Sequence, residues 1–250
     1  MSAVSAHPLA GIPEIHEGQD LAEVIAGAAG GWALDGSVVA IAHKVVSKSE
    51  GAVVELDGVD PSERARAIGL SQGRDPRVIQ VVLDESLEIL REQRGVLITR
   101  TRHGFVCANA GVDASNAARA EQLILLPRDP DASARRIRSR LRELTGEGPA
   151  VLISDSFGRA WRHGQLDVAI GLAGLSPLDD WRGRTDSMGL ELQATWLAVA
   201  DAAAATADLA RAKDSREPVV ILGGLDRYVS DDDGPGAGAL LRPLEEDLFR

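Results

Sequence analysis

The sequence predicts an α+β fold in which mixed, mainly antiparallel sheets pack against helices. Two observations lead to this prediction. Stretches with apolar residues at helical spacing are separated by short apolar runs typical of strands, and hairpins occur among the helices without a regular alternation. With 250 residues, we expect one domain over residues 1–250, with room for two intertwined subdomains.

Five stretches carry helix signals. A short helix is predicted after Asp20, a favoured N-cap residue, and it ends at the glycines around Gly30. Two later stretches begin with proline, which suits the first turn of a helix. A basic-faced helix with an aspartate cap and a long alanine-rich helix follow. The later predicted helices span residues 61–72, 76–92, 131–144 and 189–212.

Apolar runs bounded by polar or turn residues predict the strands. The first strong strand is predicted over residues 37–47, and a hairpin over 95–102 and 105–108, broken at His103 and Gly104. Further short strands are predicted at 150–154, 167–174 and 218–223. The stretch SDDDGPGAG, residues 230–238, predicts a flexible loop.

Composition limits the classes of function. The formal net charge of −11 argues against nucleic acid and anionic membranes as partners, because both repel an acidic protein. An anionic ligand would therefore need a local basic patch or bound cations. The single Cys107 cannot form an intrachain disulfide, and no signal-peptide pattern or membrane-spanning run is present, so we expect a cytoplasmic protein.

Two polar stretches follow predicted strands and offer oxygen ligands. In CANAGVDASN, Asp113 lies among small residues that let a ligand approach the backbone, although it could equally cap a helix. In LISDSFGRAWRHGQ, Asp155 and Ser156 end a buried strand, as a Mg²⁺ or Mn²⁺ site requires. Arg159 and Arg162 could then clamp phosphate or carboxylate oxygens, and the alternative is a solvated surface turn.

A third stretch, VSKSEG, is rich in lysine. Lys44 and Lys48 are four residues apart, so in an extended strand they would share one face and could meet a nucleotide phosphate. Solvated lysines are the alternative. Two roles stay open for Glu50. It could pair with a lysine, or it could hydrogen-bond to a residue that binds a metal.

Six stretches resemble, in sequence and in order, members of the coenzyme F420-0:L-glutamate ligase family, also called F420:γ-glutamyl ligases. The resemblance runs from Gly11 to Phe249. The stretches are GIPEI, VVAIAHKVVSKSEG, VCANAGVDASN, ISDSFGRAWRHGQLDVAIGLAG, DWRGRTDSMGLEL and LLRPLEEDLF.

The resemblance implies a GTP-dependent ligase that adds L-glutamate to F420-0 and then a further, γ-linked glutamate, through an acyl phosphate. It implies two divalent cations, Mg²⁺ or Mn²⁺, with K⁺ as a further candidate ion, and a homodimer. Because the chain ends at Arg250, we expect the free-standing form, which needs no flavin. A ligase for another carboxylate acceptor, and a nucleotide- and metal-binding protein without ligase activity, are the alternatives.

The resemblance also assigns roles by position. Asp113 and Asp155 match ligands of the first metal, and Ser156 matches a contact of the second. The positions that match nucleotide contacts are Ile12, Pro13, Glu14, Ile15, His43, Lys44, Lys48 and Asn116. We expect Asp113, Asp155, Arg159 and Arg162 to act in catalysis. After the alanine-rich helix the family has a glycine-containing turn, whereas this chain has LARAK at residues 209–213, which puts the second metal in question.

Overall fold

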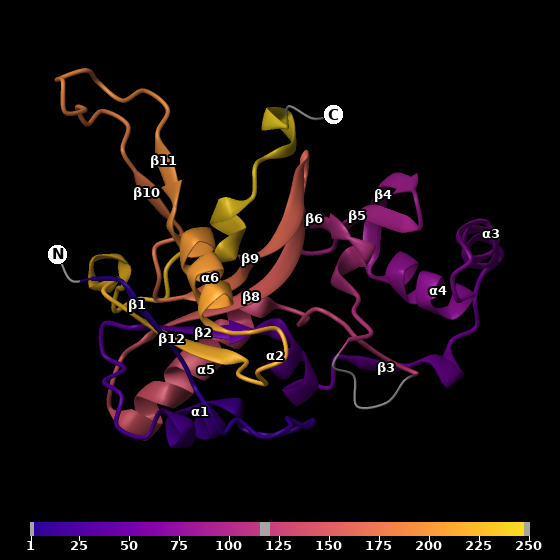
Figure 1. Cartoon of the computed structure of the whole chain (residues 1–250), viewed down its shortest axis with the longest axis horizontal. Helices are drawn as coiled ribbons and strands as arrows, with labels where there is room; N and C mark the ends of the chain where they lie inside the picture. The colour runs from indigo at the N-terminus through magenta and orange to yellow at the C-terminus, as the bar shows by residue number, and fades with distance from the viewer. Residues whose placement is uncertain (1–2, 116–120, 248–250) are drawn as a thin grey trace.

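The computed structural model describes residues 3–115 and 121–247, and it confirms the α+β fold (Figure 1). A five-stranded sheet lies at the centre, in the order β1-β12-β2-β8-β9. The β2–β8 pair is parallel and the other pairs of this sheet are antiparallel. Its strands are β1 (Ser5–Pro8), β2 (Val38–Ala42), β8 (Ala150–Arg159), β9 (Arg162–Ala173) and β12 (Val219–Gly223).

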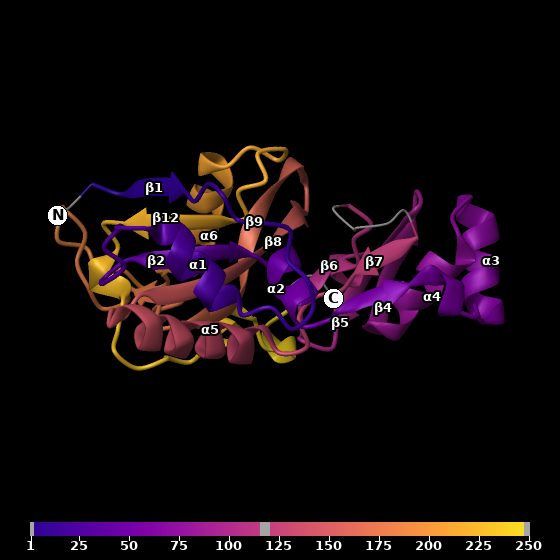
Figure 2. The ribbon, with the colours of Figure 1, turned by 90° about the horizontal axis from the view of Figure 1, so that it is seen from below.

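Helices cover both faces of this sheet, as Figure 2 shows. Helices α1 (Leu21–Ala29) and α5 (Pro130–Thr145) lie on one face, and α6 (Val199–Ala210) lies on the other. Successive residues of a strand face opposite sides, so Val39 and Ile41 pack with the first pair of helices, whereas Val38 and Ala40 pack against α6. The continuous apolar run of β2 is explained by this double burial.

Residues 53–124 form a smaller part at one end of the molecule (Figure 2). Its core includes Ile68, Ile79 and Leu97. Its elements are β3 (Val53–Glu55), α3 (Glu63–Gln72), α4 (Pro76–Asp84), β4 (Ser86–Gln93), β5 (Val96–Thr101), β6 (Val106–Ala108) and β7 (Gln122–Ile124).

A two-stranded arm, β10 (Leu178–Asp180) and β11 (Trp196–Ala198), projects away from the central sheet (Figure 1). Short 3₁₀ turns complete the chain at Leu56–Gly58, Asn109–Gly111, Asp226–Tyr228, Ala237–Leu240 and Leu244–Glu246. Within the described residues, no helix has the length and apolar character that crossing a membrane requires.

Local signals predicted several elements well. Helix α1 has Asp20 as its N-cap and ends at Gly30 in the left-handed conformation. The predicted β5–β6 hairpin is present. The basic-faced helix is α5, and the aspartate that caps it is Asp129, which accepts a hydrogen bond from the Ala132 amide.

Several predicted elements were wrong in extent. The strand predicted over 150–154 continues to Arg159, and the strand predicted over 167–174 begins at Arg162. The strand predicted over 37–47 ends at Ala42, and helix α2 (His43–Ser49) follows directly. The helix predicted over 76–92 ends at Asp84, after which β4 pairs with β5. The helix predicted over 189–212 begins at Val199, because the preceding residues complete the arm. Apolar spacing alone does not separate a strand from a helix over such short runs, and long-range pairing decides between them.

Candidate functional site

Helix α2 carries both predicted lysines and places one of them beside a predicted carboxylate. Residues four apart lie on one face of a helix, so Lys44 and Lys48 do share a face, although the predicted strand was wrong. The Lys48 ammonium pairs with Glu14. The Lys44 ammonium lies 2.7 Å from Oδ2 of Asp113. Through Lys44, α2 therefore contacts the segment that follows β6.

Asp155, on β8, faces a buried histidine from the first turn of α2. Nε2 of His43 lies 3.3 Å from Oδ1 of Asp155, and the Ser156 amide donates to that same oxygen at 2.7 Å. His43 is 2% exposed, and its Nε2 has no partner in hydrogen-bond geometry among the described residues. Nδ1 of His43 lies 3.3 Å from Oγ of Ser47. The imidazole thus contacts Asp155 through Nε2 and Ser47 through Nδ1.

Asp113 is held by its own loop and by Lys44. The amide and the hydroxyl of Ser115 donate to the two carboxylate oxygens of Asp113 at 2.6 and 2.9 Å. Burial alone would raise the pKa of Asp113, but the hydrogen bonds and the charge of Lys44, with the Ser115 contacts, hold that pKa below its ordinary value. Asp113 is therefore ionised at neutral pH. Whether it also caps a helix lies outside the described residues.

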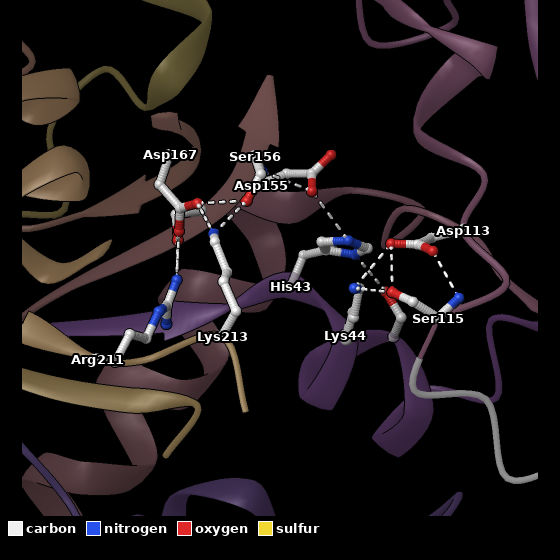
Figure 3. A network of polar contacts seen from close by, with 11 residues as sticks. His43, Lys44, Asp113, Ser115, Asp155, Ser156, Asp167, Arg211 and Lys213 are labelled. Atoms are coloured by element: carbon white, nitrogen blue, oxygen red, sulfur yellow. Dashed lines mark hydrogen bonds and ion pairs between the residues drawn. The ribbon is translucent and has the colours of Figure 1, made fainter. Parts of the chain in front are cut away.

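Asp113 and Asp155 both lie beside the first turn of α2, where Lys44 contacts Asp113 and His43 contacts Asp155 (Figure 3). We call His43, Lys44, Asp113, Ser115 and Asp155 the Asp155 cluster. No three His, Cys, Asp or Glu side chains form a metal cage among the described residues. Mg²⁺, however, commonly uses one or two carboxylates and takes its other ligands from water and phosphates. With such partners, Asp113 and Asp155 would be the protein ligands of one divalent ion.

A second group of polar residues surrounds Asp167, on β9. The β8–β9 register sets Ser156 opposite Asp167, and the Ser156 hydroxyl donates to Oδ1 of Asp167 at 2.6 Å. Ser154, two residues earlier on the same face of β8, donates to Oδ2 at 2.7 Å. The Arg211 guanidinium also binds Oδ2.

Lys213 completes this group from the connection after α6. Its ammonium donates to Oγ of Ser156 at 3.0 Å and to Oδ1 of Asp208 at 2.6 Å (Figure 3). We call Ser154, Ser156, Asp167, Asp208, Arg211 and Lys213 the Asp167 cluster.

Asp167 is an ionised carboxylate in a buried position. It is 1% exposed, and burial acts to raise its pKa. The Ser156 hydrogen bond, the positive charge of Arg211 and the Ser154 hydrogen bond outweigh burial and hold the pKa below its ordinary value. The sequence analysis did not identify Asp167 or Arg211 as site residues. The spacing of Ser154 and Ser156 on one strand face was the local signal that could have pointed to a partner opposite them.

Arg159 and Arg162 lie apart from both clusters. Strand β8 continues to Arg159, and the two arginines pair across the tip of the β8–β9 hairpin. Arg159 donates to the His163 carbonyl at 2.6 Å. The described contacts do not join either arginine to Asp113 or Asp155, so their catalytic role stays a prediction.

Three of the predicted nucleotide contacts line a cavity of about 350 Å³, and His43 and Lys44 are not among its lining residues. Glu14, Ile15 and Lys48 line it, whereas Ile12 and Pro13 are not among its lining residues. Ile15 belongs to the hydrophobic core. Asn116 lies outside the described residues.

Glu50, left open above, is a partner of α5. The Ser133 hydroxyl and the Arg136 guanidinium both bind its carboxylate. Glu50 thus holds the end of α2 against α5, and its partner is an arginine instead of a lysine.

Comparison with known proteins covers nearly the whole chain. The family described as F420-0:Gamma-glutamyl ligase matches residues 11–224. The coenzyme F420:L-glutamate ligase of Methanopyrus kandleri is 45% identical over 239 residues, which are 95% of this chain and 94% of that protein. The proteins of the same name from Methanothermobacter thermautotrophicus and Methanocaldococcus jannaschii are 44% and 43% identical, over 96% and 86% of this chain and 96% and 85% of their own lengths.

Proposed function

The chain belongs to the F420-0:Gamma-glutamyl ligase family, and on that premise we propose that it joins L-glutamate to coenzyme F420-0 and then adds a further γ-linked glutamate. The names of its relatives support a ligase of coenzyme F420 biosynthesis. One observation within the molecule supports this best. Asp113 and Asp155 contact consecutive residues of the first turn of α2, Lys44 and His43.

GTP is the proposed co-substrate. An amine does not displace hydroxide from a carboxylate, so the acceptor must first be activated. We propose that the bond between the β–γ bridging oxygen and the γ-phosphorus of GTP breaks as an acceptor carboxylate oxygen bonds to that phosphorus, giving GDP and an acyl phosphate. The α-amine of glutamate then attacks the acyl carbon, forming the amide as phosphate leaves and the amine loses a proton.

The chain's own residues bind and orient the reactants in this proposal. Lys48 lies at the 350 Å³ cavity and Lys44 lies at Asp113, so both can offset phosphate charge. Arg159 and Arg162, at the hairpin tip, would orient an anionic group of the acceptor. A divalent ion held by Asp113 and Asp155 would supply further neutralisation of phosphate charge.

A product assay tests this proposal. Purified protein incubated with F420-0, GTP, L-glutamate and Mn²⁺ should yield products whose masses increase by whole glutamyl units. Reactions without GTP should yield no such products. No mass increase, while a validated ligase is active in the same mixture, would show that F420-0 is not the acceptor. Other carboxylate acceptors tested with GTP would then identify a related ligase.

A further inference from the structure

Ser156, the residue that the resemblance assigns to a second divalent ion, is held by other side chains of this chain. Its hydroxyl donates to Asp167 at 2.6 Å and accepts from the Lys213 ammonium at 3.0 Å. Mg²⁺ binds oxygen at about 2.0–2.1 Å in an octahedral shell. A metal ion bound to Ser156 would have to displace this ammonium, as an ion at Asp113 would have to displace Lys44, but Ser156 offers a neutral hydroxyl where Asp113 offers a carboxylate.

The charges of the Asp167 cluster are already balanced. Asp167 and Asp208 carry two negative charges, and Arg211 and Lys213 carry two positive ones. Arg211 is largely buried, so the carboxylate of Asp167 is neutralised from inside the fold. In the Asp155 cluster, by contrast, Lys44 faces Asp113 and the His43 imidazole faces Asp155, so one ammonium accompanies two aspartates. The Asp167 cluster thus lacks the net negative charge that attracts a dication.

The Lys213 ammonium has one hydrogen-bond donor left for a ligand. An ammonium has three donors, and two of them are used by Ser156 and Asp208. Its side chain is 69% exposed, although its ammonium lies on the buried Asp167 side of the site. The third donor can therefore meet a group that arrives from solvent.

We propose that the ammonium of Lys213 takes the place of the second divalent ion, so that each chain binds one divalent ion and Lys213 contacts a phosphate of the nucleotide. The inference rests on the proposed function. Asp208 and Ser156 hold the ammonium in position, and Arg211 keeps Asp167 from competing for a metal.

The number of bound metal ions tests this assignment. The full chain is titrated with Mn²⁺ in the presence of a saturating non-hydrolysable GTP analogue, and bound Mn²⁺ is counted by electron paramagnetic resonance. We expect one ion per chain. Two ions in a chain that binds the analogue would overturn this inference and leave the proposed function standing. A chain that binds neither Mn²⁺ nor the analogue would overturn both.

Lys213→Ala tests the phosphate contact directly. Loss of one charge-assisted hydrogen bond should weaken binding of the analogue about tenfold at saturating Mn²⁺. Arg216→Ala is the matched control, because it removes one positive charge from an exposed position of the same connection. The control should bind the analogue as the wild type does. Equal affinities for wild type and Lys213→Ala, with unchanged unfolding midpoints, would overturn the assignment.

Discussion

The two clusters differ in how their carboxylates are neutralised. In the Asp167 cluster, a buried aspartate is bound by two hydroxyl groups and a guanidinium, all from the chain itself. In the Asp155 cluster, Asp113 is half-buried and bound by an ammonium, and Asp155 faces an imidazole without hydrogen-bond geometry. In the first cluster, the Asp167 carboxylate therefore has its partners within the protein, and Lys213 has a donor left for a ligand. The second has charge and donor positions left for a ligand.

Because of this difference, we expect the Asp167 cluster to contribute mainly to stability and the Asp155 cluster mainly to activity. Buried ion pairs are costly to break because the remaining charge loses its partner. Carboxylates that retain excess negative charge near the surface can instead bind a cation that arrives with a substrate. Substitutions in the Asp155 cluster should therefore alter activity with little loss of stability, and substitutions of the residues that hold Asp167 in the other cluster, Lys213 excepted, should do the reverse.

Asp155→Asn should have the largest effect on activity. The amide keeps the shape of the side chain but removes the charge that we propose binds the divalent ion, so the rate of GTP-dependent glutamate addition should fall about 10³-fold. The rate is measured by mass spectrometry of the products. Asp214→Asn, an exposed aspartate on the connection after α6, is the control for the charge change. Normal turnover by Asp155→Asn would show that its carboxylate is not needed.

Arg211→Met should have the largest effect on stability. It leaves the Asp167 carboxylate buried without its guanidinium, which should lower the free energy of unfolding by about 3 kcal/mol in urea titrations. Arg159→Met, at the exposed hairpin tip, should change it by less than about 0.5 kcal/mol. The double variant Arg211→Met/Asp167→Asn should recover part of the loss. An unchanged stability in Arg211→Met would mean that Ser154, Ser156 and Lys213 suffice to hold Asp167.

Sequence reasoning named Asp113, Asp155 and Lys44 of the Asp155 cluster as candidates, but it named neither Asp167 nor Arg211 of the Asp167 cluster. Asp113, Asp155 and Lys44 stand in short polar stretches directly beside apolar runs, so local order was informative. The partners of Asp167 come from β8 and from the connection after α6, more than forty residues further along in the case of Arg211. Their meeting depends on the β8–β9 register and on the packing of α6, which no local pattern encodes.

The same reasoning explains the errors in the fold. The apolar run before His43 resumes with Val45 and Val46 inside α2, so its composition did not mark the point where the strand ends. The stretch after Asp84 keeps helical spacing but pairs with β5 instead. In both places tertiary contacts override local preference.

The smallest expected effects are losses of unfolding free energy when one serine of each cluster is replaced by alanine. The folded-state pKa of Asp167 lies below its ordinary value of 3.8, so its ionised form contributes stability above that pH and the contribution is lost as pH falls through the folded-state pKa. Ser156→Ala removes a hydrogen bond to this charge and should lower the free energy of unfolding by about 1.5 kcal/mol at pH 7. The difference from wild type should shrink at pH 3.

Ser115→Ala is the counterpart in the Asp155 cluster. It also removes a hydrogen bond to an aspartate with a lowered pKa, but the Asp113 side chain is 37% exposed, and water replaces the lost partner. Its loss of stability at pH 7 should therefore be smaller than that of Ser156→Ala, with the same direction of pH dependence. Urea titrations of both variants at pH 7 and pH 3 measure this. A pH-independent loss in Ser156→Ala would mean that Ser156 acts through packing and not by stabilising the ionised carboxylate, which would remove the distinction between the two clusters.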